Sequence, residues 1–128
     1  MSVTVYGIPT CGTVKKARKW LDDHGIAHTW VDFRATPPEP ARVARWVAAF
    51  GSGPLKNTSG GAYRDLGDEK LGWDEARWTA AFQGDSMLVK RPVVEVDGAV
   101  VLVGFREEAF AERFGAAGRA KTRAAAER

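Results

Sequence analysis

Cys11 is the only cysteine of the chain, and it lies where a strand is expected to end and a helix to begin. A short β-branched run over 3–6 precedes it, and a helical pattern starts near Gly12. The first amides of a helix have no internal partners, and the helix dipole places partial positive charge there. We therefore expect the pKa of Cys11 to fall below the value of about 8.5 for a free thiol. The ordinary alternative is a buried, unreactive cysteine.

The residues that follow Cys11 limit the chemistry. Val14 stands where the second thiol of a Cys-x-x-Cys pair would be, so a dithiol cycle within one chain is excluded. A monothiol cycle needs a thiol from outside, and glutathione is the natural candidate. Gly12 permits close approach to the first amides of the helix, which form a ready anion site. Thr13 would hydrogen-bond the thiolate or cap the helix.

The elements that position this cysteine follow from hydrophobic periodicity. Helical spacing predicts helices over 12–24, about 37–50, 73–82 and 106–114. In the helix over 73–82 we expect Trp73, Ala76 and Ala80 to face inward, with Trp78 as a further candidate. Strands are predicted over 3–6, 28–33, 92–96 and 99–103, and the last two form a hairpin with a type I′ turn at Asp97-Gly98.

The order β-α-β, helical insertion, β-β-α predicts an α/β protein with a thioredoxin-like fold. It has a four-stranded mixed sheet with helices on both faces and a helical insertion over about 37–86. We expect a single domain over 1–114. In this architecture a proline before the third strand, often cis, faces the residue after the first strand, and Pro92 holds that place. Arg91 is thereby aimed at Cys11.

Composition and charge narrow the class of protein. The chain has 128 residues, 45% hydrophobic and 27% charged, with a net charge of +3. The tail over 115–128 carries this whole excess of basic residues, and we expect it to be a frayed helix or disordered. A neutral body is not typical of nucleic-acid binding, so no nucleic-acid partner is expected. No apolar run is long enough to span a membrane, and a single cysteine without an apolar leader favours the cytoplasm.

The run from Tyr6 to Ala17, together with Arg91-Pro92-Val93-Val94 and Val103-Gly104-Phe105, resembles the arsenate reductase-like (ArsC/Spx) family, most of all its YffB branch. The resemblance covers roughly 2–114. It implies a thioredoxin-like fold, a cysteine nucleophile and, in the YffB branch, a glutathione-dependent thiol reductase without a settled substrate. True arsenate reductases of the family are recycled by glutathione and glutaredoxin.

The candidate site follows from these patterns. Cys11 and Arg91 are the expected catalytic residues, because a guanidinium stabilises a thiolate and binds an oxyanion or carboxylate in bidentate fashion. The alternative for Arg91 is a surface ion pair. Residues expected to bind substrate or glutathione are Gly12, Thr13, Lys15, Lys56 and Pro92. No bound cofactor and no metal site are expected.

Two further functions stay open. Arsenate reductases also use an arginine in the loop between helices and another after the hairpin. Lys56 aligns with the first, Arg106 is only near the second, and little arsenate turnover is therefore expected. An Spx-like redox or transcription-related binding protein is the other alternative, against which the missing Cys-x-x-Cys counts. The expected partners are glutathione or glutaredoxin and a small-molecule or protein thiol or disulfide.

Overall fold

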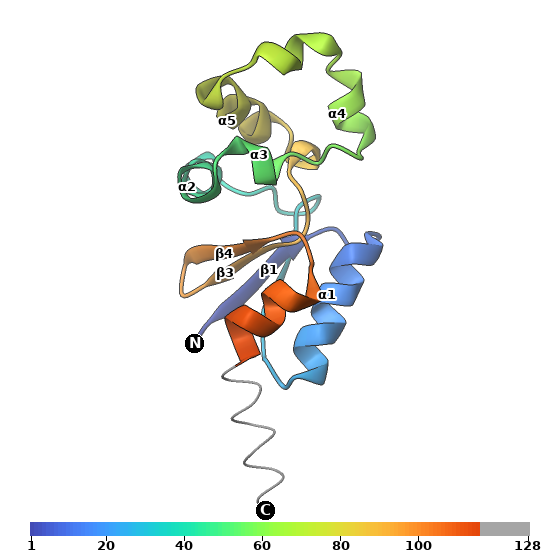
Figure 1. Cartoon of the computed structure of the whole chain (residues 1–128), viewed down its shortest axis with the longest axis vertical. Coiled ribbons are helices and arrows are strands. Elements are labelled where there is room, and N and C mark those ends of the chain that lie inside the picture. The colour runs from blue at the N-terminus through green and yellow to red at the C-terminus, as the bar shows by residue number, and fades with distance from the viewer. Residues whose placement is uncertain (116–128) are drawn as a thin grey trace, which may run out of the picture.

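The computed structural model describes residues 1–115, and a mixed sheet forms its centre (Figure 1). Its strands are β1 (Val3–Gly7), β2 (Thr29–Asp32), β3 (Val93–Val96) and β4 (Ala99–Val103), in the order β2-β1-β3-β4. β1 pairs in parallel with β2 and antiparallel with β3, and β3 pairs antiparallel with β4. The predicted α/β class and thioredoxin-like sheet are confirmed.

Helix α1 (Gly12–Asp23) connects the two parallel strands. It buries Val14, Ala17, Trp20 and Leu21, the apolar stripe of its sequence. The chain leaves the helix through Gly25, whose φ of 68° suits a residue without a side chain. Residues 107–115 form a last helix on the same side of the sheet, where Phe110 packs edge-on against Trp20.

The insertion contains helices α2 (Pro40–Phe50), α3 (Ser52–Leu55), α4 (Gly61–Asp65) and α5 (Glu75–Gly84), with short 3₁₀ turns η1 (Asp68–Gly72) and η2 (Ser86–Leu88). These helices gather at one end of the molecule, away from α1 (Figure 1). Helix α2 turns Trp46 against Tyr6 of β1, so the insertion and the sheet share one apolar cluster.

The predicted inward face of α5 is right at Trp78 and wrong at the two alanines. Ala76 and Ala80 are exposed and Trp73 is only half-buried, whereas Trp78 and Phe82 are fully buried. The helix starts after Asp74, whose side chain accepts a hydrogen bond of 2.8 Å from the amide of Arg77. Two aromatic rings four residues apart bury far more apolar area than two alanines, and they decide which face turns inward.

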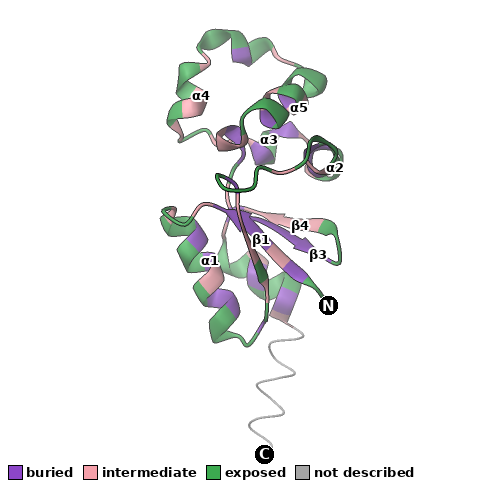
Figure 2. Ribbon diagram, turned by 180° about the vertical axis from the view of Figure 1, so that it is seen from behind, coloured by how far each residue is buried: buried purple, intermediate pink, exposed green. Residues whose placement is uncertain are grey.

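The predicted hairpin turn is confirmed, since Asp97 and Gly98 have φ of 53° and 84°. Strand β3 is buried along its whole length, as Figure 2 shows by colour, and this includes Glu95. The Glu95 carboxylate accepts hydrogen bonds from the Tyr6 hydroxyl at 3.2 Å and from Trp46 Nε1 at 2.7 Å, and it pairs with Arg42. Its burial is therefore compensated by three donors.

Two predictions concern the C-terminal end of the chain, most of which lies outside the described residues. The basic tail predicted for 115–128 lies outside the described residues except for Gly115. The predicted end of the domain at 114 therefore stays a prediction as well.

Within residues 1–115 no helix is both long enough and apolar enough to cross a membrane.

Candidate functional site

Cys11 is the N-cap residue of α1. Its backbone is extended, with φ of −82° and ψ of 120°, and its carbonyl oxygen accepts the hydrogen bond of 3.1 Å from the Lys15 amide. The amide of Cys11 donates to the carbonyl oxygen of Ile8 at 3.3 Å, which closes the turn after β1. The Cys11 thiol is half-buried and forms no disulfide. Its place between a strand and a helix is the one that the sequence predicts.

The surroundings of the sulfur lower the pKa of Cys11. Partial burial is the largest influence and raises the pKa, but four others outweigh it together. The amides of Val14 and Thr13 point at the sulfur, although the thiol makes no capping bond of full geometry. The charge of Arg91 and its contact with the sulfur act in the same direction. The helix start and the arginine thus favour the thiolate.

Arg91 is fixed from behind by backbone oxygens. Its Nη1 donates to the carbonyl oxygens of Met87 at 3.3 Å and Val89 at 3.5 Å and lies 3.8 Å from the Met87 sulfur. Its Nε is buried without a hydrogen-bond partner among the described residues. The Arg91-Pro92 peptide is cis, as the fold predicts, and Pro92 is buried beneath the site.

A cavity of about 320 Å³ opens at the sulfur. It is lined by Cys11, Thr13, Asn57, Ser59, Gly60, Lys90 and Arg91. The structure therefore brings together three of the predicted residues, Cys11, Thr13 and Arg91. Sequence reasoning missed the other four. Three of them lie in the loop over 51–61, for which the sequence predicts only Lys56 as a binding residue, and the fourth, Lys90, directly precedes Arg91.

Lys56 is not among the residues that line this cavity. The segment around it pairs with the segment before Arg91, because Asn57 donates its amide to Leu88 O at 2.9 Å and Lys56 lies opposite Val89. Successive side chains of an extended segment point to opposite sides. The Lys56 ammonium lies 4.6 Å from the centre of the Trp78 ring, and Asn57 faces the cavity instead.

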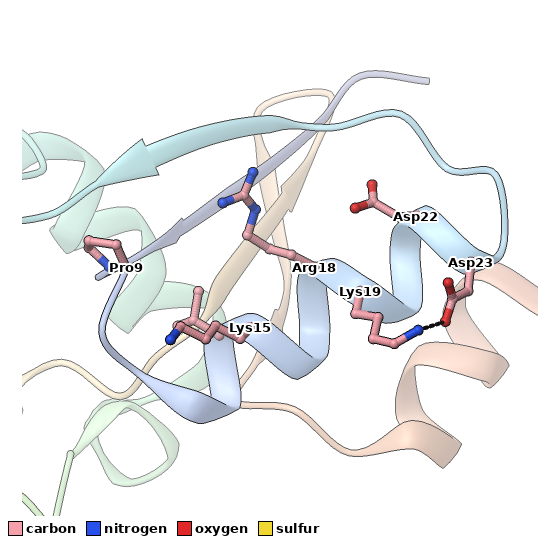
Figure 3. A pocket seen from close by; sticks show the side chains of 7 residues that line it. Pro9, Lys15, Arg18, Lys19, Asp22 and Asp23 are labelled. Carbon is pink, nitrogen blue, oxygen red and sulfur yellow. Dashed lines mark hydrogen bonds and ion pairs between the residues drawn. The ribbon is translucent and has the colours of Figure 1, made fainter.

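The remaining predicted residues lie around this centre. Lys15 lines another hollow, of about 480 Å³, that runs along α1 with Arg18 and Asp22 (Figure 3). Gly12 is next to the sulfur, and a Cβ there would meet no atom within 4 Å. Arg64 donates to Ser59 O at 3.0 Å and braces the loop that lines the cavity.

A metal centre has no ligand set within residues 1–115, where no three His, Cys, Asp or Glu side chains gather. The two histidines serve the fold. His24 stacks on Trp20 with 3.8 Å between ring centres, and its Nδ1 is 2.8 Å from the Trp20 carbonyl oxygen. His28 lies between the Ile26 carbonyl oxygen and the Arg18 guanidinium.

Known proteins share both the sequence and this architecture. A protein of Bacillus subtilis named YusI is 38% identical over 118 residues, which cover 89% of this chain and 99% of that one. The solved structure of a YFFB protein superposes with a TM-score of 0.79 at 36% identity, covering 86% of this chain and 96% of that one.

An arsenate reductase (ArsC) related protein from Brucella melitensis superposes with a TM-score of 0.71 at 36% identity, over 89% of this chain and 95% of that one. The family profile described as the ArsC family matches residues 6–113, which include Cys11, the insertion, Arg91 and the hairpin. The chain therefore belongs to the ArsC family.

Proposed function

We propose that this protein is a monothiol oxidoreductase in which Cys11 is the nucleophile and glutathione the reductant. The observation that carries the proposal is the environment of one sulfur atom. The thiol of Cys11 lies at the start of α1, beside Arg91, and at the mouth of a cavity. Membership of the ArsC family supports thiol-based redox chemistry of this general kind.

The reaction needs one sulfur on the protein and one free glutathione thiol from outside. The Cys11 thiolate attacks the glutathionyl sulfur of a mixed disulfide, the S–S bond breaks, and the substrate thiolate leaves and takes a proton from water. A glutathione thiolate then attacks the glutathionyl sulfur held on Cys11. Oxidised glutathione leaves, and Cys11 returns as the thiolate. The substrate sulfur is reduced from disulfide to thiol and the sulfur of the entering glutathione is oxidised from thiol to disulfide, while the other glutathionyl sulfur stays at the disulfide level.

The position of Val14 supports an outside reductant. Val14 is 1% exposed and packs under the first turn of α1, so the site has no neighbouring thiol that resolves the adduct. Cys11 is the only cysteine of the chain. A glutathione or glutaredoxin thiol must therefore enter the cavity from solvent, and the half-exposed sulfur permits this approach.

Mass spectrometry after exposure to oxidised glutathione tests the proposal. We expect one glutathionyl adduct on Cys11, which reduced glutathione removes, and no adduct in Cys11→Ser. A coupled assay with glutathione reductase and NADPH then measures turnover of a glutathionylated substrate. An adduct that reduced glutathione does not release would contradict the cycle.

Arsenate is a second candidate electrophile, because the similar protein from Brucella melitensis is named as arsenate reductase (ArsC) related and the cavity wall is cationic. We expect little turnover. Within residues 1–115, Arg91 is the only arginine that lines the cavity, Lys56 faces Trp78, and Arg106 is exposed and within 3.8 Å of Glu108. Arsenate-dependent oxidation of glutathione in the presence of glutaredoxin measures this activity directly.

A further inference from the structure

The charges that line the Cys11 cavity are unbalanced. Among the described residues that line it, Lys90 and Arg91 are the only ionisable side chains apart from the thiol, and none is a carboxylate. Neither cation forms an ion pair with any residue within 1–115. Even with Cys11 as the thiolate, the wall keeps one positive charge in excess.

The two cations have different places. Arg91 is held by the carbonyl oxygens of Met87 and Val89 beside the sulfur, where it stabilises the thiolate. Lys90 is exposed and makes no hydrogen bond through its ammonium to the described residues, so its charge is available to a ligand.

The direction of Lys90 is built into the fold. Its amide donates to Leu55 O at 2.7 Å, which fixes its backbone against the insertion. Val89 is fully buried, so the next side chain points to the opposite side. There the stem of Lys90 crosses Gly104, where an added Cβ would lie 2.9 Å from Lys90 Cε. Gly104 has φ of 78° and donates its amide to Pro92 O at 2.7 Å. Because the glycine has no side chain, it leaves room for the stem of Lys90.

We propose that Lys90 is a specificity-determining residue which selects disulfides and thiols that carry a carboxylate several bonds away from the reacting sulfur. The sulfur of such a ligand must meet Cys11, where Arg91 is already held beside the thiolate, so Lys90 is the cation that remains for a carboxylate elsewhere in the cavity. Asn57, Ser59 and Gly60 line the same cavity without charge and are available to the body of the ligand. This inference rests on the proposed function and names its substrate class.

Rates of mixed-disulfide formation on Cys11 test the inference in a single step. Three disulfides are compared at pH 7 and low salt by mass spectrometry: oxidised glutathione, which is anionic, 2-hydroxyethyl disulfide, which is neutral, and cystamine, which is cationic. In the wild type we expect oxidised glutathione to react faster than cystamine. Lys90→Glu reverses one charge in the cavity wall and should lower the ratio of these two rates by about tenfold or more.

The neutral disulfide distinguishes an effect of charge on the rate from an effect of damage to the fold. We expect its rate to change less than about threefold in Lys90→Glu, because the interaction that is lost is between charges. Lys56→Glu is the matched control, since it makes the same charge change on a lysine whose ammonium lies on Trp78. It should leave the ratio within about twofold, and 0.5 M salt should weaken the wild-type preference. Lys90→Gln removes the positive charge without adding a carboxylate and so tests the same effect.

The outcomes distinguish this inference from the function on which it rests. If Cys11 reacts with none of the three disulfides, both the proposed function and the role of Lys90 are overturned. If all three react and neither Lys90→Glu nor Lys90→Gln changes the ratio, only the role of Lys90 is overturned. An equal decrease of the rate ratio in Lys56→Glu would show that the preference comes from the overall electrostatic field of the protein. That result would also overturn the role of Lys90.

Discussion

Asn57 Nδ2 and Arg91 Nη1 donate to the same carbonyl oxygen, that of Met87, each at 3.3 Å. One backbone group therefore anchors both the loop wall of the Cys11 cavity and the cation beside its sulfur. Since a carbonyl oxygen carries no formal charge, it fixes the guanidinium without neutralising it. The full charge of Arg91 stays available to the thiolate, as the lowered pKa of Cys11 requires.

The first prediction concerns this charge. Alkylation of Cys11 by iodoacetamide across pH should give an apparent pKa below about 8.5, the value of a free thiol. Arg91→Ala should raise it by about one pH unit or more, because an opposite charge at this range favours the ionised form. Lys56→Ala removes a cation that faces Trp78 and should leave the profile unchanged. A wild-type profile like that of free cysteine would contradict an activated thiol.

The sequence was sufficient for the fold and for the proximity of Cys11 and Arg91. Period-two and helical patterns identify β1, α1, the hairpin and the last helix, because each buries a continuous apolar face. Cys11 and Arg91 are both found from the sequence because each adjoins such an element. The glycine-rich loop over 51–61 has no periodicity, so its wall of the cavity was not predictable.

The error at Lys56 has a structural cause. Lys56 and Asn57 are neighbours, and which of them faces the cavity depends on the pairing of their segment with Leu88 and Val89. A shift of one residue in an extended pair exchanges the two sides. This choice is made by tertiary packing, which no local pattern contains. The error at Ala76 and Ala80 has another cause, since burial of the larger aromatic rings of α5 decides its inward face.

The second prediction concerns the contact beneath the reactive turn. A Cβ at Gly7 would lie 2.7 Å from Cγ2 of Val14, which is 1% exposed and has no room to move. Gly7→Ala should cost about 1–3 kcal/mol in the free energy of unfolding and should displace the start of α1. Urea denaturation measures the first effect and Cys11 alkylation the second.

Gly12→Ala is the matched control for this change. Its Cβ would meet nothing within 4 Å, so the variant should be unchanged or stabilised by up to about 1 kcal/mol, as expected for a glycine replaced within a helix. Equal losses of stability in Gly7→Ala and Gly12→Ala would show that the contact with Val14 is not the cause.

The third prediction concerns the buried ion pair under the insertion. Glu95 is 3% exposed, and Arg42 is the one cation that pairs with it in the part of the chain that the structure describes. Arg42→Met should cost about 2–3 kcal/mol, since it leaves the carboxylate buried without a countercharge. Arg42→Met combined with Glu95→Leu should recover part of this loss. Lys19→Met breaks the exposed pair of Lys19 with Asp23 and should not change the urea midpoint. A double variant less stable than Arg42→Met would contradict this account.

The fourth prediction follows from the phenol that shares this network. Burial of Tyr6, followed by the nearby charge of Glu95, raises its pKa from 10.0 to about 12. A group whose pKa is raised in the folded state binds its proton more tightly there, so it contributes stability below the pKa of the unfolded chain and loses it as pH rises to the folded value. The stability advantage of the wild type over Tyr6→Phe should therefore shrink between pH 10 and pH 12. Unfolding by urea at a series of pH values measures it in both proteins, and because every other group titrates in both, their contributions cancel in the difference. A difference that stays constant over this range would mean that Tyr6 ionises equally well in the folded and unfolded chain, contrary to its burial against Glu95.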